Sequence, residues 1–196
     1  KTPFANGLKI DNQTLPIAVV IENTKACRRY SGISLSNVTI GESPQWLQDK
    51  LKAIGQRPVN NIVDITNFIL HETGQPLHAF DAAAIREQKV VVKNLPAGTP
   101  FLTLDDKERK LSQDDLMICN GAGEAMCIAG VFGGKGSGIT AATNNIFLES
   151  AWFNPVDIRK TSFRHGLRTD AAMRFEKNVD ISNAVNALKK AAVMIT

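Results

Sequence analysis

Residues 146–162 read IFLESAWFNPVDIRKTS, and this stretch joins the two kinds of element that the rest of the chain contains. Its first half is an apolar run from Ile146 to Phe153, whose length suits a buried strand. Asn154 and Pro155 follow, and this pair is typical of a helix start. The asparagine side chain can cap free backbone N–H groups, and proline fits the first helical position. The stretch therefore predicts a core strand that leads directly into a helix.

The elements expected elsewhere do not alternate regularly between strand and helix. Apolar runs and apolar–polar alternation predict strands at 17–21 (a buried run), 32–40, 89–93, 101–104, 109–111 and 116–119. Helical spacing of apolar residues predicts helices at 44–54, with Ser43 as its cap, at 58–71, and over most of 155–196. Residues 75–81 (QPLHAFD) are expected to be irregular. This pattern predicts an α+β fold, with a mixed or antiparallel sheet packed with helices, in a single domain of 196 residues.

The composition is that of an ordinary globular domain. The chain has a mass of 21.3 kDa, and its residues are 43% hydrophobic and 21% charged, which argues against disorder or a fibre. No apolar run approaches the roughly 20 residues that span a bilayer, so we expect no membrane segment. The first nine residues contain no initiator Met and no signal-peptide core, and helical spacing continues up to Ile195. We therefore expect a piece of a longer chain.

The sequence contains few groups that could bind a metal or act as a nucleophile. Cys27, Cys119 and Cys127 include no CxxC pair and have no histidine nearby, which argues against a disulfide framework or a zinc site and favours a reducing cytoplasm. The glycine-rich segment GVFGGKGS (130–137) lacks the spacing of a phosphate-binding loop. No serine or cysteine lies in a recognisable activated setting. Catalysis, if present, is expected to position water and to polarise a substrate.

Positive charge is concentrated in one part of the sequence. Between Ile158 and Lys177 there are six Lys or Arg residues together with His165, against only Asp170 and Glu176. Such a stretch is either a solvated face of a helix or a surface for an anionic polymer.

Four motifs carry a resemblance to a known family. RPVNNIVDITNFILHETGQPLHAFD (57–81), AGVFGG (129–134), IFLESAWFNPVDIRKTS (146–162) and RHGLRTDAAMRFEKNVD (164–180) occur in this order. Together they resemble the B3/B4 editing module of the bacterial phenylalanyl-tRNA synthetase beta subunit, over the whole of residues 1–196.

The resemblance implies post-transfer editing, which is hydrolysis of the ester of mischarged Tyr-tRNA(Phe), together with RNA binding. It implies the 3′ end of tRNA(Phe) and an alpha subunit in an α2β2 heterotetramer as partners, in the cytoplasm. It implies neither a metal nor a cofactor in this module, because ATP and Mg are used elsewhere in the synthetase, and no aminoacylation by this module alone.

A physical reason exists for a second, editing pocket. A pocket shaped for phenylalanine rejects an analogue that only adds a hydroxyl by about 100-fold in comparable cases. A pocket that requires the hydroxyl discriminates better, because phenylalanine would leave its buried polar groups unpaired. We therefore expect an apolar slot for the ring, an acceptor at its end and a held water near the ester.

The resemblance assigns substrate binding to five positions. The family's matching glutamate, Glu149, reads the tyrosine hydroxyl together with a backbone group of Gly130. Gly130 and Gly133 would let the backbone approach the substrate closely, which a side chain would block. Thr169 and Ala171 match the family's pocket residues beside the ring. Without the resemblance, Glu149 could instead face solvent or pair with an arginine, the glycines could serve a tight turn, and Ala171 could simply pack in a helix.

The resemblance also assigns catalytic and tRNA-binding roles. In the family, the histidine matched by His78 faces the terminal adenosine and the water, either as a general base or as a holder of the water. The residues matched by Asn67 and Thr66 line the same pocket and orient water or ribose. The basic positions Arg164, His165 and Arg168 are candidates for phosphate contacts. The alternatives are a structural histidine at 78, and ordinary helix capping or an exposed helix face at 66 and 67.

Two other functions stay open on the sequence: a non-catalytic scaffold that packs tRNA and neighbouring domains, and a free-standing trans-editing hydrolase. The hydrolase predicts that Glu149, His78, Asn67, Thr169 and the two glycines converge on one cavity of amino-acid size. A scattered arrangement would favour the scaffold.

Overall fold

The computed structural model describes residues 14–196. The first nine residues, in which the sequence shows no signal-peptide core, lie outside the described residues. The elements, in chain order, are β1 (Ala18–Ile21), β2 (Cys27–Leu35), α1 (Gln45–Ala53), α2 (Asn61–Thr73), β3 (Leu77–Asp81), the short 3-10 turns η2 (Ala82–Ala84) and η3 (Arg86–Gln88), β4 (Lys89–Asn94), β5 (Pro100–Leu102), β6 (Glu108–Lys110), β7 (Leu116–Asn120), β8 (Ala125–Ile128), β9 (Phe132–Gly133), β10 (Ile146–Phe153), α3 (Pro155–His165), α4 (Asp170–Phe175) and α5 (Ala184–Ile195).

The strands form two larger sheets and one hairpin. Strand β10 is the centre of a three-stranded antiparallel sheet in the order β2–β10–β3. The five-stranded sheet has the order β1–β4–β7–β8–β9, in which β1 and β4 are parallel and the other pairs are antiparallel. Strands β5 and β6 form the predicted hairpin. The α+β fold with a mixed sheet is therefore confirmed.

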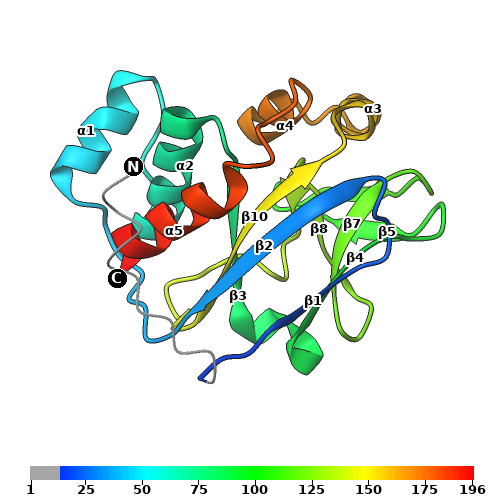
Figure 1. Cartoon of the computed structure of the whole chain (residues 1–196), viewed down its shortest axis with the longest axis horizontal. Helices are drawn as coiled ribbons and strands as arrows, with labels where there is room; N and C mark the ends of the chain where they lie inside the picture. The colour runs from blue at the N-terminus through cyan, green and yellow to red at the C-terminus, as the bar shows by residue number, and fades with distance from the viewer. Residues whose placement is uncertain (1–13) are drawn as a thin grey trace.

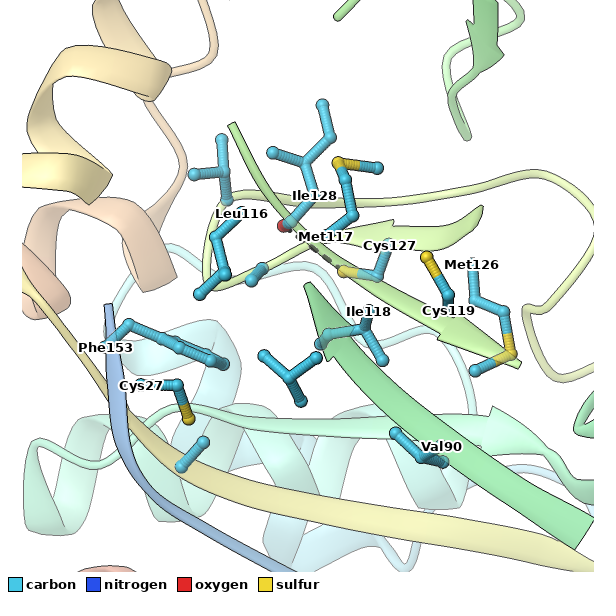
Figure 2. Close-up of a cluster of buried hydrophobic side chains, with 14 of the residues drawn as sticks. Cys27, Val90, Leu116, Met117, Ile118, Cys119, Met126, Cys127, Ile128 and Phe153 are labelled. Atoms are coloured by element: carbon cyan, nitrogen blue, oxygen red, sulfur yellow. Dashed lines mark hydrogen bonds between the residues drawn. The ribbon is translucent and has the colours of Figure 1, made fainter. Parts of the chain in front are cut away.

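Strand β10 separates two hydrophobic cores. Its residues alternate between the two faces of the sheet, as in any strand. Ile146 and Leu148 pack in a core with helices α1, α2 and α5, which lie on one side of the three-stranded sheet in Figure 1. Phe147, Ala151 and Phe153 belong to a second core with the five-stranded sheet. Figure 2 shows Phe153 in this second core, near Cys27 and residues of β7. All eight residues of β10 are buried, which explains why the run is continuously apolar apart from two positions.

Side-chain caps fix where the helices near the cavity described below begin. Helix α2 begins three residues later than predicted, because the Asn60 side chain accepts a hydrogen bond from the Val63 N–H. It ends at Gly74, whose φ of 77° is left-handed. The predicted cap Ser43 does not cap α1. Its hydroxyl instead donates to the buried carboxylate of Asp64 on α2.

Three further sequence predictions are corrected. Residues 77–81 form strand β3, because this segment pairs with β10 along its whole length. The strand predicted at 32–40 covers 27–35, and its pairing with β10 extends to Cys27. The strand at 18–21 exists, but it is an edge strand and its residues are largely exposed.

Candidate functional site

A cavity of about 500 Å³ lies between β3, β10, helix α2, the segment around β9 and the start of α4. This size is typical of a pocket for a small molecule. All eight residues predicted to bind or act on the substrate line it: Thr66, Asn67, His78, Gly130, Gly133, Glu149, Thr169 and Ala171. The remaining walls are mainly apolar, with Val63, Leu70, Val131 and Phe175 among them. The predicted convergence on one cavity is therefore observed.

Glu149 is a buried carboxylate that lines this cavity. Its side chain extends from the middle of β10 and its residue is only 5% exposed. Its Oε2 accepts a hydrogen bond of 2.7 Å from the Tyr30 hydroxyl. Burial raises the pKa of Glu149 to about 7, and the hydrogen bond from Tyr30 acts in the opposite direction. Neither of the alternatives considered for Glu149 holds, because the side chain does not face solvent and, among residues 14–196, no arginine pairs with it.

Tyr30 is a residue of the site that sequence reasoning missed. It is the only tyrosine of the chain, and it lies on β2 two positions before Gly32, where the predicted strand began. Tyr30 is paired with Ala151 of β10, so it is a diagonal neighbour of Glu149 on the same face of the sheet. A strand prediction that included residue 30 would have placed it on the same face of the strand as Gly32, but not beside Glu149.

His78 stands directly opposite Glu149 in the register of β3 and β10. Directly opposite residues project on the same face, with their Cβ atoms about 5 Å apart. The His78 ring packs edge-to-face on Phe80, with ring centroids 4.4 Å apart. Its Nε2 is buried and has no hydrogen-bond partner among the described residues. Burial lowers the pKa of His78 to about 4, so the imidazole is neutral at pH 7 and a ring nitrogen can accept a proton or a hydrogen bond.

Helix α2 contributes two polar residues to the cavity wall. Thr66 is buried, and its hydroxyl donates to the carbonyl of Val63 one turn earlier, at 2.7 Å. The hydroxyl oxygen can therefore still accept a hydrogen bond from a molecule in the cavity. Asn67 is half-buried beside it. Neither residue caps the helix, because the cap is Asn60.

The two glycines are required for different reasons. A Cβ on Gly133 would lie 2.9 Å from Leu104 Cδ1 and 3.2 Å from His78 Cε1, so the absence of a side chain lets this backbone approach the imidazole. Gly130 has a left-handed φ of 66°, and a Cβ there would lie 2.8 Å from the Phe153 ring. The turn and the close packing therefore both require glycine at 130.

The first turn of helix α4 forms another wall of the cavity. The Thr169 side chain caps this helix by accepting from the Ala172 N–H, and its hydroxyl donates to the Val131 carbonyl at 2.9 Å. Thr169 thus joins α4 to the glycine-containing segment 130–133. Ala171 follows in the first turn and lines the cavity.

The three predicted phosphate contacts do not line the cavity. Arg164 and His165, at the end of α3, both bind the buried carboxylate of Asp115. Arg168 forms a two-bond pair with Glu176, at 2.7 and 2.8 Å. A phosphate would have to compete with these carboxylates, and the role of the three residues in binding tRNA stays a prediction.

Two structural features were also sought in the described residues. Within residues 14–196, no group of three or more His, Cys, Asp or Glu side chains is arranged to hold a metal ion. No helix in the same range is long and apolar enough to cross a membrane.

Comparison with known proteins identifies relatives over nearly the whole chain. The family model described as "B3/4 domain" matches residues 26–196. The chain is 57% identical over 193 residues to a protein of Bacteroides thetaiotaomicron named phenylalanine–tRNA ligase beta subunit, which covers 98% of this chain and 23% of the relative. It is 47% identical over 188 residues to the protein of the same name from Carboxydothermus hydrogenoformans, covering 96% of this chain and 23% of that one. The chain thus spans about a quarter of the length of these relatives.

A similar fold is found in a solved structure. An N-terminal fragment of the phenylalanyl-tRNA synthetase beta subunit from Pyrococcus horikoshii matches with a TM-score of 0.54 and 14% sequence identity. The match covers 76% of this chain and 48% of the other. At this identity the likeness shows the fold alone.

Proposed function

Because the chain belongs to the B3/4 domain family and matches part of phenylalanine–tRNA ligase beta subunits, we propose that it is an editing module that hydrolyses the ester of mischarged Tyr-tRNA(Phe). The observation that carries this proposal is the single cavity in which a buried carboxylate and a neutral imidazole stand opposite each other on paired strands. The first can recognise a phenol, and the second can hold a water.

Recognition of tyrosine follows from the surroundings of Glu149. A tyrosyl ring fills the apolar part of the cavity, and its hydroxyl donates to the carboxylate. A phenylalanyl ring would displace water from the same carboxylate and supply no donor. Leaving a buried polar group unpaired costs about 1–3 kcal/mol, and more for a charged group, so phenylalanine is rejected by the bond it cannot make.

Hydrolysis proceeds with water as the nucleophile. Cys127 is the thiol that lines the cavity, and burial raises its pKa well above the usual value, so the thiol is protonated at neutral pH and is a poor nucleophile. His78 Nε2 is buried and unpartnered, which suits it to accept a hydrogen bond from a water beside the ester. Thr66 and Asn67 orient this water or the terminal ribose from helix α2. The imidazole either removes a proton from the water or holds it in place.

The same proposal includes the partners of the module. The substrate is the 3′ end of tRNA(Phe), and Arg164, His165 and Arg168 are proposed phosphate contacts. We further propose that the module functions within a beta subunit bound to an alpha subunit in an α2β2 enzyme in the cytoplasm. Aminoacylation with ATP and Mg takes place elsewhere in that enzyme.

The convergence of all eight predicted residues on one cavity supports the hydrolase over a non-catalytic scaffold. The similarity to long beta subunits supports a module of a subunit over a free-standing trans-editing protein.

The test is deacylation of Tyr-tRNA(Phe) and Phe-tRNA(Phe) by the complete synthetase that contains this module. We expect the wild-type enzyme to hydrolyse the tyrosyl ester much faster, and Glu149→Ala to remove that preference. Glu42→Ala, which changes an exposed glutamate, is the matched control and should behave as wild type. If the wild-type enzyme hydrolyses both esters at the same rate, or if Glu149→Ala leaves the preference unchanged, the proposed function is wrong.

A further inference from the structure

The Glu149 carboxylate already accepts a hydrogen bond from a phenol of the protein itself, the side chain of Tyr30. The Tyr30 hydroxyl donates to Oε2 at 2.7 Å, from a position diagonal to Glu149 on the neighbouring strand β2. Among residues 14–196, no other side-chain or backbone donor is within hydrogen-bond distance of the Glu149 carboxylate. The second oxygen, Oε1, is therefore left to a molecule in the cavity.

Among residues 14–196, no lysine or arginine acts on the Glu149 carboxylate in a way that could replace this hydrogen bond. The described residues that line the cavity include neither lysine nor arginine. Burying a carboxylate without a cation is costly unless hydrogen bonds compensate for the water it loses. In this site, the compensating donor is the Tyr30 hydroxyl.

The packing around the pair restrains the Glu149 side chain. The residue opposite Glu149 on β2 is Gly32, and the Phe147 ring lies over this glycine so closely that a Cβ there would be 2.0 Å from Phe147 Cζ. Phe147 therefore covers the strand where a side chain at residue 32 would stand. Tyr30 contacts the carboxylate from the other diagonal, and His78 stands opposite on β3.

From this geometry we propose that Tyr30 is a positioning residue: its hydroxyl holds one oxygen of Glu149 in the ionised, acceptor-only form, so that the other oxygen is presented to the hydroxyl of a phenolic aminoacyl ester. This inference rests on the proposed editing function and deepens it. An ionised carboxylate accepts a hydrogen bond from a phenol and offers nothing to a benzene ring.

Four titratable groups around Glu149 ionise outside the pH range in which Glu149 changes charge. Cys27 and Tyr30 face it from β2, Cys127 from β8 and His78 from β3, and Asp170 lines the same cavity from α4. Burial raises the pKa of Cys27 to about 12 and raises the pKa values of Tyr30 and Cys127 well above their usual ranges. Burial lowers the pKa of His78 to about 4. Between pH 5.5 and 9 these four groups are neutral, while Glu149, with its pKa of about 7, changes charge.

The test compares Tyr30→Phe, Glu149→Gln and the double variant in the complete synthetase. The readout is the ratio of the rates of Tyr-tRNA(Phe) and Phe-tRNA(Phe) deacylation between pH 5.5 and 9. In the wild type the ratio should rise with pH through about 7, as Glu149 ionises. Tyr30→Phe removes the donor and keeps the ring. It should move this midpoint upward by about one pH unit, because a hydrogen bond to a charged group is of that strength. At pH 7 the ratio then falls about fivefold, and it recovers near pH 9.

The Glu149→Gln background is the control for an indirect structural effect. Glutamine does not titrate, so its ratio should be independent of pH, and adding Tyr30→Phe should change the ratio less than about twofold if Tyr30 acts through Glu149. A purely structural role of Tyr30 would change the ratio by the same factor at every pH, or by the same factor in the wild-type and Glu149→Gln backgrounds. Either of those results overturns the inference.

A second variant tests the proposal even if Tyr30→Phe fails to fold. Site-specific replacement of Tyr30 by 3-fluorotyrosine keeps the shape of the side chain and makes the hydroxyl a stronger donor. It should move the midpoint downward, and an unchanged midpoint overturns the inference. A wild-type enzyme without any preference for the tyrosyl ester would overturn the proposed function itself. A wild type with that preference but no shift in either Tyr30 variant would overturn only the role of Tyr30.

Discussion

Asp115 is predicted to make a large contribution to the stability of the fold. It is fully buried before β7, and its carboxylate accepts hydrogen bonds from the Ser112 N–H at 2.8 Å and the Thr161 hydroxyl at 2.8 Å. It also binds His165 Nε2 at 2.7 Å and the Arg164 guanidinium. These bonds fasten the end of α3 to the strand β7 that follows Asp115.

Replacing Asp115 by alanine leaves several buried donors without an acceptor. Arg164 is one-third exposed and can turn to water, but the His165 side chain is only 6% exposed and Thr161 is buried. Each unpaired buried group costs about 1–3 kcal/mol, and breaking a buried ion pair from one side costs about 3–5 kcal/mol. We therefore expect Asp115→Ala to lower the free energy of unfolding by about 3–5 kcal/mol.

The neighbouring residue provides a matched control. Asp114 is 69% exposed and lies 3.7 Å from the same guanidinium, and such a surface pair contributes at most about 1 kcal/mol. The free energy of unfolding is measured by urea titration followed by far-UV circular dichroism, at pH 7, for both alanine variants. If Asp115→Ala were as stable as Asp114→Ala, the conclusion that Asp115 stabilises the packing of α3 against β7 would be wrong.

The remaining predictions concern the cavity and its walls. His78→Ala should slow deacylation of Tyr-tRNA(Phe) by about 10²-fold or more while changing the preference for the tyrosyl ester less than about threefold, which single-turnover assays with both esters would check. The pKa of His78 is about 4 in the folded chain and about 6.5 in the unfolded chain. The unfolded chain therefore binds more protons between these values, and the free energy of unfolding falls as the pH drops from 6.5 to 4. Urea titrations across this range should show a smaller loss for His78→Gln than for the wild type. Gly130→Ala should destabilise the chain by about 2 kcal/mol or more, because its φ is left-handed and the new Cβ would collide with the Phe153 ring, whereas Gly136→Ala meets open space and should change the melting temperature little.

Much of the fold could be predicted because local signals agree with the tertiary structure. The strand from Ile146 to Phe153 and the helix after it were predicted with their observed limits at 146, 153 and 155, since both faces of the strand are buried and Asn154 caps the helix. Strand β3 was missed because it is short and follows Gln75-Pro76, and its strand conformation depends on pairing with β10. Such pairing partners are not visible in the local sequence.

The residues of the candidate site also differ in how far the sequence could predict them. Glu149 and His78 were identified by motif, but nothing in the local sequence indicates that they stand opposite each other in the register. Tyr30 is 119 residues from Glu149 in the chain, and its role appears only when β2 and β10 are side by side. The partners of Arg164 and Arg168 were likewise hidden, because charge counting along a sequence cannot separate a guanidinium that is bound to a carboxylate from one that is available.

The pairing of β3 with β10 has a consequence for how this site can change. Sliding one strand by a single residue would turn the imidazole at 78 to the side covered by helices and would leave the carboxylate at 149 alone in the hollow. The distance between the Glu149 and His78 side chains is therefore set by the main-chain pairing of the two strands. A one-residue insertion or deletion inside β3 should therefore remove the imidazole from the cavity and spare the carboxylate, and one inside β10 should displace the carboxylate and spare the imidazole.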